Sequence, residues 1–210
     1  MRHLTRFAFS FSLLVTLPLY GDEAIVYSEL LSGYLSNIST LSGSFEQHSM
    51  EHSEQHSAVY SGALWLAKPN HFRLDTAAPS LQSLVSDGVN FWSYDEDLEQ
   101  VIISKLNENL NQVPILLFSA DVGRIEDTYH ISGYEDEEGE HFLLQPVTDA
   151  SLFRSLTLEF KGGVPASIKV RAANGQATIY NLNQVVINGQ IPAGKFSFTA
   201  PEHVDVIDDR

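Results

Sequence analysis

The sequence predicts a mainly β protein built around a large antiparallel sheet that forms a barrel or part of one. Three observations lead to this prediction. Many short stretches alternate apolar and polar residues with a period of two, as half-buried strands do. Gly, Pro, Asn and Asp separate these stretches, as turns would. Two segments, 24–39 and 112–120, instead carry the pattern of helices.

The N-terminus has the order of a secretory signal peptide. Two arginines precede an apolar run, 7–20, which is shorter than the roughly 20 residues that a membrane-spanning helix needs. We expect cleavage after Gly21, which gives a signal peptide of residues 1–21 and a single secreted domain of residues 22–210. An uncleaved N-terminal anchor is the alternative, because Leu19 and Gly21 follow the small-x-small cleavage pattern only loosely.

Composition narrows the chemistry and the partners. The chain contains no cysteine, so neither a disulfide nor the acylated cysteine of a lipoprotein can form. Asp and Glu number 27 against 12 Lys and Arg, which gives a formal net charge of -15 at pH 7. Such a charge argues against nucleic acid as a partner. The acidity either keeps the protein in solution or steers its docking toward basic protein partners.

The two helical segments differ in character. In 24–39, apolar residues recur at helical spacing with Ser, Glu and Asn between them, so one face of the helix is apolar. These apolar residues are Val26, Leu30, Leu31, Tyr34, Leu35 and Ile38. In 112–120, Pro114 stands where the first turn of a helix tolerates it, and the residues after it are apolar. We expect a short helix there that covers the open sheet.

The strand pattern is clearest in 156–160 and 168–170, with Gly162-Gly163 between them as the turn of a hairpin. Further strands are expected at 43–50, 58–67, 71–76, 81–87, 89–94, 99–104, 128–133, 141–145, 176–186 and 195–199. In 58–67 neither face is clearly polar, since Trp65 lies on one and Leu64 on the other. Such a sheet encloses either a packed core or a ligand cavity, and composition and periodicity do not choose between them.

Catalytic signatures fail on particular residues. The segment 189–195 mimics a phosphate-binding loop, but Phe196 stands where a Ser or Thr must hold magnesium. The segment 95–106 begins like a calcium loop and lacks both the required Gly and the closing Glu. There is no G-x-S-x-G motif and no thiol nucleophile. We therefore expect neither an enzyme nor a cofactor.

Three histidines are spaced four residues apart, which would align them as metal ligands on a helix. They are His48, His52 and His56. They fall in a polar stretch between two expected strands, where a hairpin loop gives no such alignment. We expect no metal site.

A series of short motifs runs through most of the chain in a fixed order. They are GSFEQ (43–47), GALWLAKPNHFRL (62–74), VSDG (85–88), FWSYD (91–95) and LEQV (98–101), followed by Gly175-Gln176, Phe196, Phe198 and VDVI (204–207). Each motif is weak alone, whereas their order and spacing are specific. The chain in this respect resembles the outer-membrane lipoprotein carrier family, LolA.

The resemblance implies a half-open antiparallel β-barrel that encloses a hydrophobic cavity covered by short α-helices. It implies a periplasmic chaperone that acts as a monomer. Such a chaperone receives acylated lipoproteins from an inner-membrane ABC exporter, shields their acyl chains and delivers them to the outer membrane, where a receptor lipoprotein is present in many bacteria. A periplasmic sensor module of the same fold, which binds lipid or a lipopeptide, is the alternative.

The resemblance also suggests which residues form the site. The expected cavity residues are Leu31, Leu35, Phe45, Leu64, Trp65, Phe72, Leu74, Phe91, Ile115, Leu116, Leu117 and Phe118. For each apolar position, ordinary core packing is the alternative role. Lys68 stands where the family has an arginine that holds the lid closed, and it lacks the planar fork of arginine. Leu74 replaces a family tryptophan and keeps the site apolar.

Overall fold

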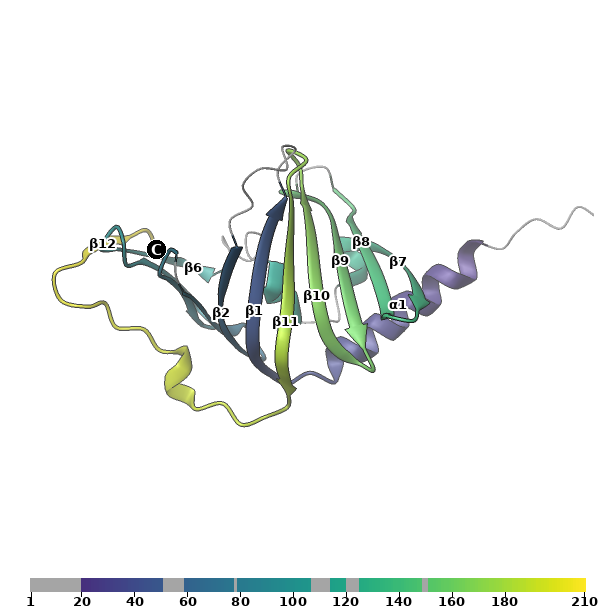
Figure 1. Ribbon diagram of the computed structural model, residues 1–210, viewed down its shortest axis with the longest axis horizontal. Helices are drawn as coiled ribbons and strands as arrows, with labels where there is room; N and C mark the ends of the chain where they lie inside the picture. Colours follow the sequence, from purple (N-terminus) through teal and green to yellow (C-terminus); the bar gives the residue numbers. More distant parts are fainter. Residues whose placement is uncertain (1–19, 51–58, 78, 107–113, 120–124, 149–150) are drawn as a thin grey trace, which may run out of the picture.

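The computed structural model describes residues 20–50, 59–77, 79–106, 114–119, 125–148 and 151–210 (Figure 1). In this part of the chain most residues belong to one antiparallel sheet. Its strands are β1 (Thr40–Met50), β2 (Val59–Ala67), β3 (His71–Thr76), β4 (Gln82–Asp87), β5 (Asn90–Asp95), β6 (Gln100–Lys105), β7 (Tyr129–Asp136), β8 (Gly139–Pro146), β9 (Phe153–Lys161), β10 (Val164–Ala172), β11 (Ala177–Ile187) and β12 (Asp205–Asp208).

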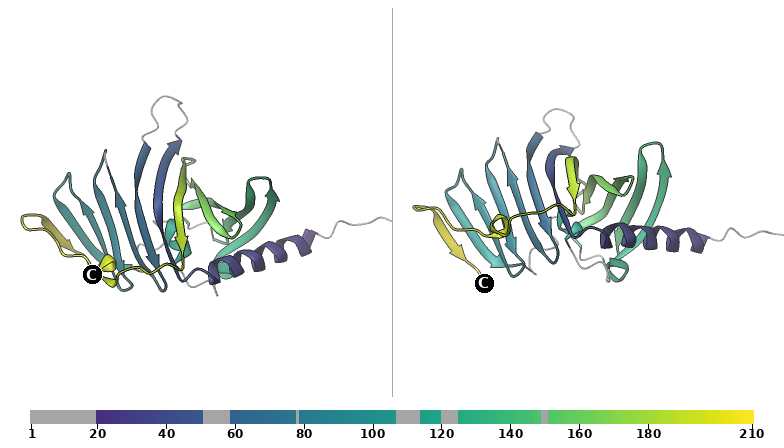
Figure 2. Two further views of the ribbon diagram at one scale, coloured as in Figure 1. Left: turned by 60° about the horizontal axis from the view of Figure 1, so that its bottom comes forward. Right: turned by 90° about the horizontal axis from the view of Figure 1, so that it is seen from below.

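The sheet has the strand order β12-β6-β5-β4-β3-β2-β1-β11-β10-β9-β8-β7. All neighbouring strands are antiparallel except β12, which pairs with β6 in parallel. β1 pairs with β11, far along the chain, and this contact joins the two halves of the sheet. The first and last strands in the order do not meet, so the sheet is curved but open (Figure 2). The predicted fold class, a half-open antiparallel barrel with short helices, is confirmed.

The hairpin predicted at Gly162-Gly163 is present. Both glycines have positive φ angles, 59° and 78°, which suit the tight turn that joins twisted antiparallel strands. On either side, Lys161 pairs with Val164, and the register then brings Leu158 opposite Ile168. Because successive side chains of a strand point to opposite faces, Leu158 and Ile168 are fully buried on the same side. We call this side, which also carries Leu64, the inner face, and the opposite side the outer face.

The helices match the sequence pattern closely. α1 (Tyr20–Ser36) overlaps the predicted helix 24–39 and ends three residues earlier than expected. A short 3-10 helix, η1 (Pro114–Phe118), begins at the proline where a first turn was predicted. α3 (Ile125–Thr128) is a single turn before β7. None of the helices in the described ranges is long and apolar enough to cross a membrane. The signal peptide prediction falls mainly on residues 1–19, which lie outside the described residues.

The strand predicted at 195–199 is wrong. This segment contains a 3-10 helix, η3 (Ala193–Phe196), and then extended chain that pairs with no strand. Phe196 contacts His71, with ring centroids 5.6 Å apart, and Phe198 contacts Trp92 and Tyr94 at 6.4 and 5.8 Å. The alternation of Phe196 and Phe198 therefore reflects packing across the outer face of the sheet, and the pairing strand is β12, which the sequence did not reveal.

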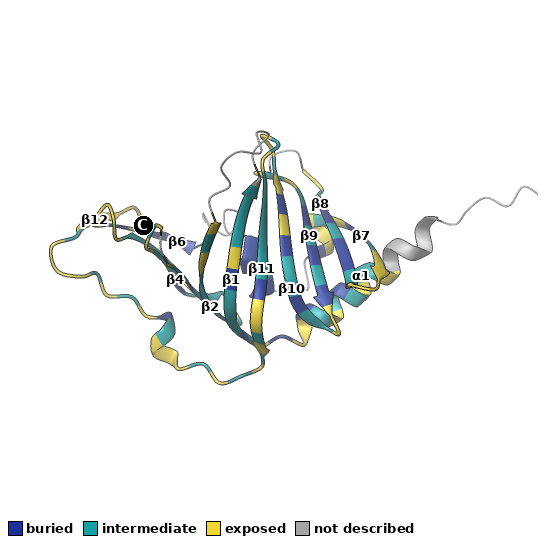
Figure 3. Ribbon diagram, viewed as in Figure 1, coloured by how far each residue is buried: buried dark blue, intermediate teal, exposed yellow. Residues whose placement is uncertain are grey.

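The C-terminal segment also explains why the strands from β2 to β5 have two apolar faces. Leu64 and Leu66 of β2 are buried on the inner face, whereas Trp65 lies on the outer face, where the Nζ of Lys195 stands 3.7 Å from its ring centroid. Figure 2 shows the C-terminal segment crossing these strands, and Figure 3 shows buried residues in both halves of the sheet. Each apolar face is thus covered by another part of the chain.

A tight contact at Gly62 gives a test of this register. A Cβ atom at position 62 would lie 2.1 Å from the carbonyl oxygen of Asp75 and 2.7 Å from the ring of Phe45. Since backbone and a buried ring must move, Gly62→Ala is expected to lower the free energy of unfolding by about 1–3 kcal/mol. Denaturant unfolding measures this change.

The matched control is Gly33→Ala. Gly33 is an exposed residue within α1, and a Cβ atom there would have no neighbour within 4 Å. Alanine favours the helix by about 0.5–1 kcal/mol, so this variant should be more stable than the natural chain. Equal effects of the two substitutions would contradict the contact at Gly62.

Candidate functional site

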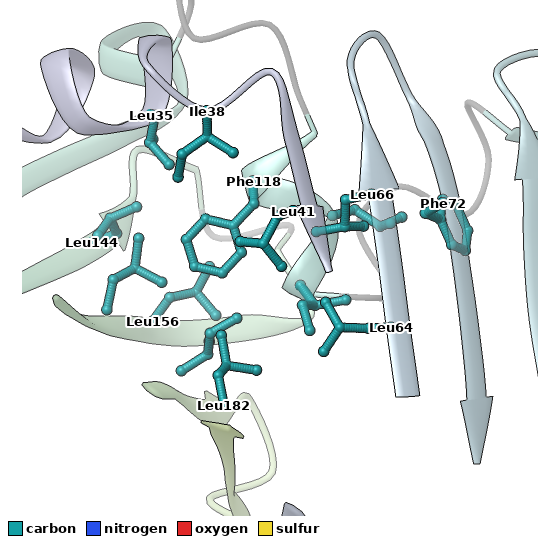
Figure 4. Packing of buried hydrophobic residues seen from close by; sticks show 14 of the residues in the cluster. Leu35, Ile38, Leu41, Leu64, Leu66, Phe72, Phe118, Leu144, Leu156 and Leu182 are labelled. Carbon is teal, nitrogen blue, oxygen red and sulfur yellow. The ribbon is translucent and has the colours of Figure 1, made fainter. Parts of the chain in front are cut away.

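The inner face of the sheet carries one continuous apolar cluster. Its residues come from both halves of the sheet, from α1 and from η1. In Figure 4 the Phe118 ring of η1 lies in the middle of the cluster, with Leu35 and Ile38 on one side and Leu182 on the other. Leu64, Leu156 and the Phe118 ring are each at most 1% exposed. The cluster is therefore shielded from water by the chain itself.

The structure brings together nearly all of the predicted cavity residues. Ten of them lie buried in the cluster: Leu31, Leu35, Phe45, Leu64, Phe72, Leu74, Phe91, Ile115, Leu116 and Phe118. Leu117 is half-buried and packs against it. The contact of Phe72 with Phe91, at 5.9 Å between ring centroids, marks the end of the cluster on the side of β5.

Trp65 does not lie with these residues. Its neighbours in β2, Leu64 and Leu66, point to the inner face, so alternation places the indole on the outer face under Lys195. There it contacts the C-terminal segment and has no access to the apolar cluster. The period-two rule, applied strictly along β2, would have separated Trp65 from the cavity residues.

A large part of the cluster was not among the predicted site residues. The strands β8 to β11 contribute Phe142, Leu144, Leu156, Leu158, Phe160, Ile168, Val170 and Leu182. Alternation in 156–160 and 168–170 was the available signal, and it identified the strands. It did not identify the site, because the resemblance motifs are concentrated in 43–101.

A group of aromatic rings joins α1 and η1 to the half of the sheet that contains β8 to β11. The ring of Tyr34 lies 5.1 Å from Phe160 and 6.0 Å from Phe142, measured between centroids. Phe160 also contacts Phe118 at 6.0 Å, edge to face. Edge-to-face and tilted rings attract each other beyond the burial of their area. These contacts position both helical segments over the inner face.

Three polar contacts hold α1 in place, each to a different part of the structure. Lys68, after β2, donates from Nζ to the carbonyl oxygen of Leu35 at 2.5 Å. Tyr34 donates from its hydroxyl to Oε1 of Glu140, in β8, at 2.7 Å. Ser28 donates to a carboxylate oxygen of Glu126, in α3. Adjacent residues of α1 are thus bound to opposite halves of the sheet.

The electrostatics of these contacts have a clear cause. The last turn of α1 contains no basic residue, so Lys68 brings a cation to the negative end of the helix dipole. There the carbonyl oxygen of Leu35 accepts hydrogen bonds from both Lys68 and the backbone N–H of Ile38. On the other side, the hydrogen bond to Glu140, with burial and the charges of Glu140 and Glu135, raises the pKa of Tyr34 to about 12. The second carboxylate oxygen of Glu140 is buried without a hydrogen-bond partner.

The arrangement on the inner face consists of buried apolar side chains. Among the described residues, no group of three His, Asp or Glu side chains is placed to hold a metal ion. His48 lies in β1, 3.9 Å from a carboxylate oxygen of Glu46, while His52 and His56 lie outside the described residues. The inner face is suited to a ligand made of hydrocarbon.

Comparison with known proteins agrees with this geometry. Residues 36–199 match the family described as outer membrane lipoprotein carrier protein LolA. Among proteins named outer-membrane lipoprotein carrier protein, that of Pseudomonas paraeruginosa is 36% identical over 90% of this chain and 89% of its own, and that of Chromohalobacter salexigens is 30% identical over 96% of both.

A crystal structure of an uncharacterized conserved protein from Thermus thermophilus shares the fold. It has a TM-score of 0.52 and 12% identity, and the match covers 86% of this chain and 97% of that chain. The family match extends through both halves of the sheet and through the C-terminal segment as far as Thr199. The chain therefore belongs to the family of the outer membrane lipoprotein carrier protein LolA.

Proposed function

We propose that this protein is a periplasmic carrier of lipoproteins. It receives an acylated lipoprotein from an ABC exporter of the inner membrane, shields the acyl chains against the inner face, and delivers the cargo to the outer membrane, to a receptor lipoprotein where one is present. The observation that carries the proposal is the continuous apolar cluster on the inner face of an open sheet, covered by short helical segments. The predicted signal peptide and the family relationship support the location and the cargo.

The energetics explain why such cargo needs a carrier. Burial of each methylene contributes about 0.8 kcal/mol, so an acyl chain of roughly 15 methylenes contributes on the order of 12 kcal/mol. A carrier must therefore offer an apolar surface of comparable extent. The apolar residues of α1 and η1 cover this surface, and acyl chains would replace them. Exchange of one apolar partner for another keeps the net free energy of binding small enough for release.

In this proposal α1 and η1 are the lid. The lid is held by apolar packing and by the polar contacts of Lys68, Tyr34 and Ser28, each of which is a single hydrogen bond between α1 and its neighbour. Each of these bonds has one charged partner, and a hydrogen bond of this kind contributes about 1.5–3 kcal/mol net. These contacts add to the stability of the closed position of α1, so opening requires new contacts that replace them.

Release of a purified lipoprotein from inner-membrane spheroplasts tests the function. The natural chain should release a soluble one-to-one complex. Phe72→Glu should not, because it places a carboxylate within the apolar cluster, where Phe72 is 1% exposed. The control Val89→Glu adds the same charge at a residue that is 71% exposed and should release cargo normally.

The same assay can distinguish a loss of the lipid site from a failure to fold. A photo-reactive phenylalanine analogue at position 72 keeps an aromatic ring in the cluster and should cross-link to acylated cargo, whereas the same analogue at Trp92, on the outer face, should not. If the natural chain folds and releases nothing while the exporter is active, the carrier function is wrong, and the lipid-sensing module becomes the better account.

Lys68→Met tests the first polar contact of the lid. The substitution keeps most of the aliphatic side chain and removes the donor to Leu35. We expect faster amide hydrogen exchange in the last turn of α1 and stronger binding of a fluorescent apolar probe. Lys68→Arg, which restores the residue typical of the family, should exchange like the natural chain or more slowly. Unchanged exchange in Lys68→Met would show that this contact does not hold the lid.

Tyr34 and Glu140 form the second contact, and its state can be measured by alkaline titration. The natural chain should contain a tyrosine that ionises near pH 12, absent from Tyr34→Phe. Because the folded pKa lies above the ordinary value of 10, the stabilisation is complete below pH 10 and is lost as pH rises through 12. Glu140→Gln keeps an acceptor but removes the charge, so the pKa of Tyr34 should fall toward its ordinary value. A Tyr34 that ionises near pH 10 in the natural chain would exclude the contact.

A further inference from the structure

Two basic residues on the outer face are exceptional in this acidic protein. The described part of the chain contains nine Lys and Arg residues, and seven of them have a hydrogen bond, an ion pair or a ring contact. Within that part, Lys169 and Arg171 alone have none of these contacts. They lie two residues apart in β10, so both point to the outer face.

The two residues line the same half-open pocket, of about 190 Å³, together with Leu143, Ser155 and Thr157. The strand register explains this arrangement. Thr157 of β9 pairs with Lys169 on one side and with Leu143 of β8 on the other, and Ser155 pairs with Arg171. Two cationic side chains and two hydroxyl groups therefore surround one apolar side chain.

This pocket is separate from the acyl-chain site. Leu156 and Leu158, the strand neighbours of Thr157, are buried in the cluster of the inner face, as is Val170 between the two basic residues. The sheet itself therefore stands between the pocket and the cluster. A ligand on the outer face would not compete with an acyl chain for space.

The nearest carboxylate along β9 is already engaged. One oxygen of Glu159 is 3.3 Å from Nζ of Lys161, and the other accepts a hydrogen bond from Ser167 at 3.0 Å. In β8, His141 is turned toward Asp136, with 2.9 Å between Nε2 and Oδ1. Neither Glu159 nor Asp136 forms an ion pair with Lys169 or Arg171. The chain has a formal net charge of -15, so two adjacent unpaired cations form a positively charged patch in a negatively charged protein.

We propose that this pocket binds a phosphate group, either of a soluble phosphate compound or of an anionic lipid headgroup. The guanidinium of Arg171 offers a planar fork of donors, and the ammonium of Lys169 adds a second charge. Ser155 and Thr157 add hydroxyl donors from the neighbouring strand, which suits a tetrahedral anion approached from several directions. The volume is below the roughly 300–1,000 Å³ of sites for drug-sized ligands, so the pocket fits a small group.

Titration with inorganic phosphate, followed by NMR amide shifts at constant ionic strength, tests the proposal on the full chain. Saturable shifts are expected at residues 143, 155, 157, 169 and 171, and acetate should bind more weakly. Arg171→Ala and Lys169→Ala should each weaken phosphate binding about tenfold. Arg154→Ala is the matched control: it removes one positive charge from β9 outside the pocket and should leave the affinity unchanged.

Vesicles distinguish the two sources of the phosphate group. If the group belongs to a lipid, the chain should sediment with phosphatidylglycerol vesicles, and Arg171→Ala should abolish this while Arg154→Ala does not. Binding of inorganic phosphate without vesicle binding would assign a soluble phosphate compound.

The proposal would be overturned by amide shifts that do not saturate, that chloride reproduces, or that both pocket variants retain. Equal binding of acetate would overturn the choice of phosphate and indicate an acidic peptide. These outcomes do not involve cargo, so they are independent of the carrier function.

Discussion

The inner face of an open sheet, apolar from β5 to β7 in the strand order, is the constraint on which the rest of the structure depends. A closed barrel or a second sheet would bury such a face permanently, whereas here only short helical segments cover it. Phe118 of η1 fills the middle of the cluster, and Leu35 of α1 lies at one side of it. The cover consists of side chains with the same chemistry as an acyl chain, which makes exchange between cover and cargo physically reasonable.

The outer face also has apolar residues that need a cover, and the C-terminal segment supplies it. Trp65, Trp92 and Tyr94 would leave a large apolar surface exposed if the sheet ended the structure there. The C-terminal segment crosses them and then adds β12 to the edge of the sheet, where it pairs with β6. This covering segment is anchored at its end by strand pairing. α1, in contrast, pairs with no strand and is joined to the sheet by side-chain contacts, so the two covers differ in how easily they can move.

Local patterns in the sequence predicted the elements well, because turns and alternation are local properties. Gly162-Gly163 marked a hairpin at the correct residues, and Pro114 marked the start of a short helix, which has 3-10 and not α-helical geometry. The failures involve contacts between distant residues. Alternating phenylalanines predicted a strand at 195–199. They instead pack against strands that lie far away in the sequence, and a local pattern cannot indicate such contacts. The Tyr34–Glu140 hydrogen bond joins residues 106 positions apart, and no local pattern in either segment predicts it.

The polar contacts of the lid bear on how it opens. The hydrogen bond to Glu140 and the neighbouring carboxylates raise the pKa of Tyr34 to about 12, so the hydroxyl remains a donor throughout the neutral range. A modest change in pH near neutrality therefore leaves this contact intact. In the proposed carrier function, the lid therefore opens by competition at this contact, because cargo or a partner protein would offer contacts that replace those of α1. A contact that stays intact near neutral pH fits the proposal that uptake and release of cargo take place in one aqueous compartment.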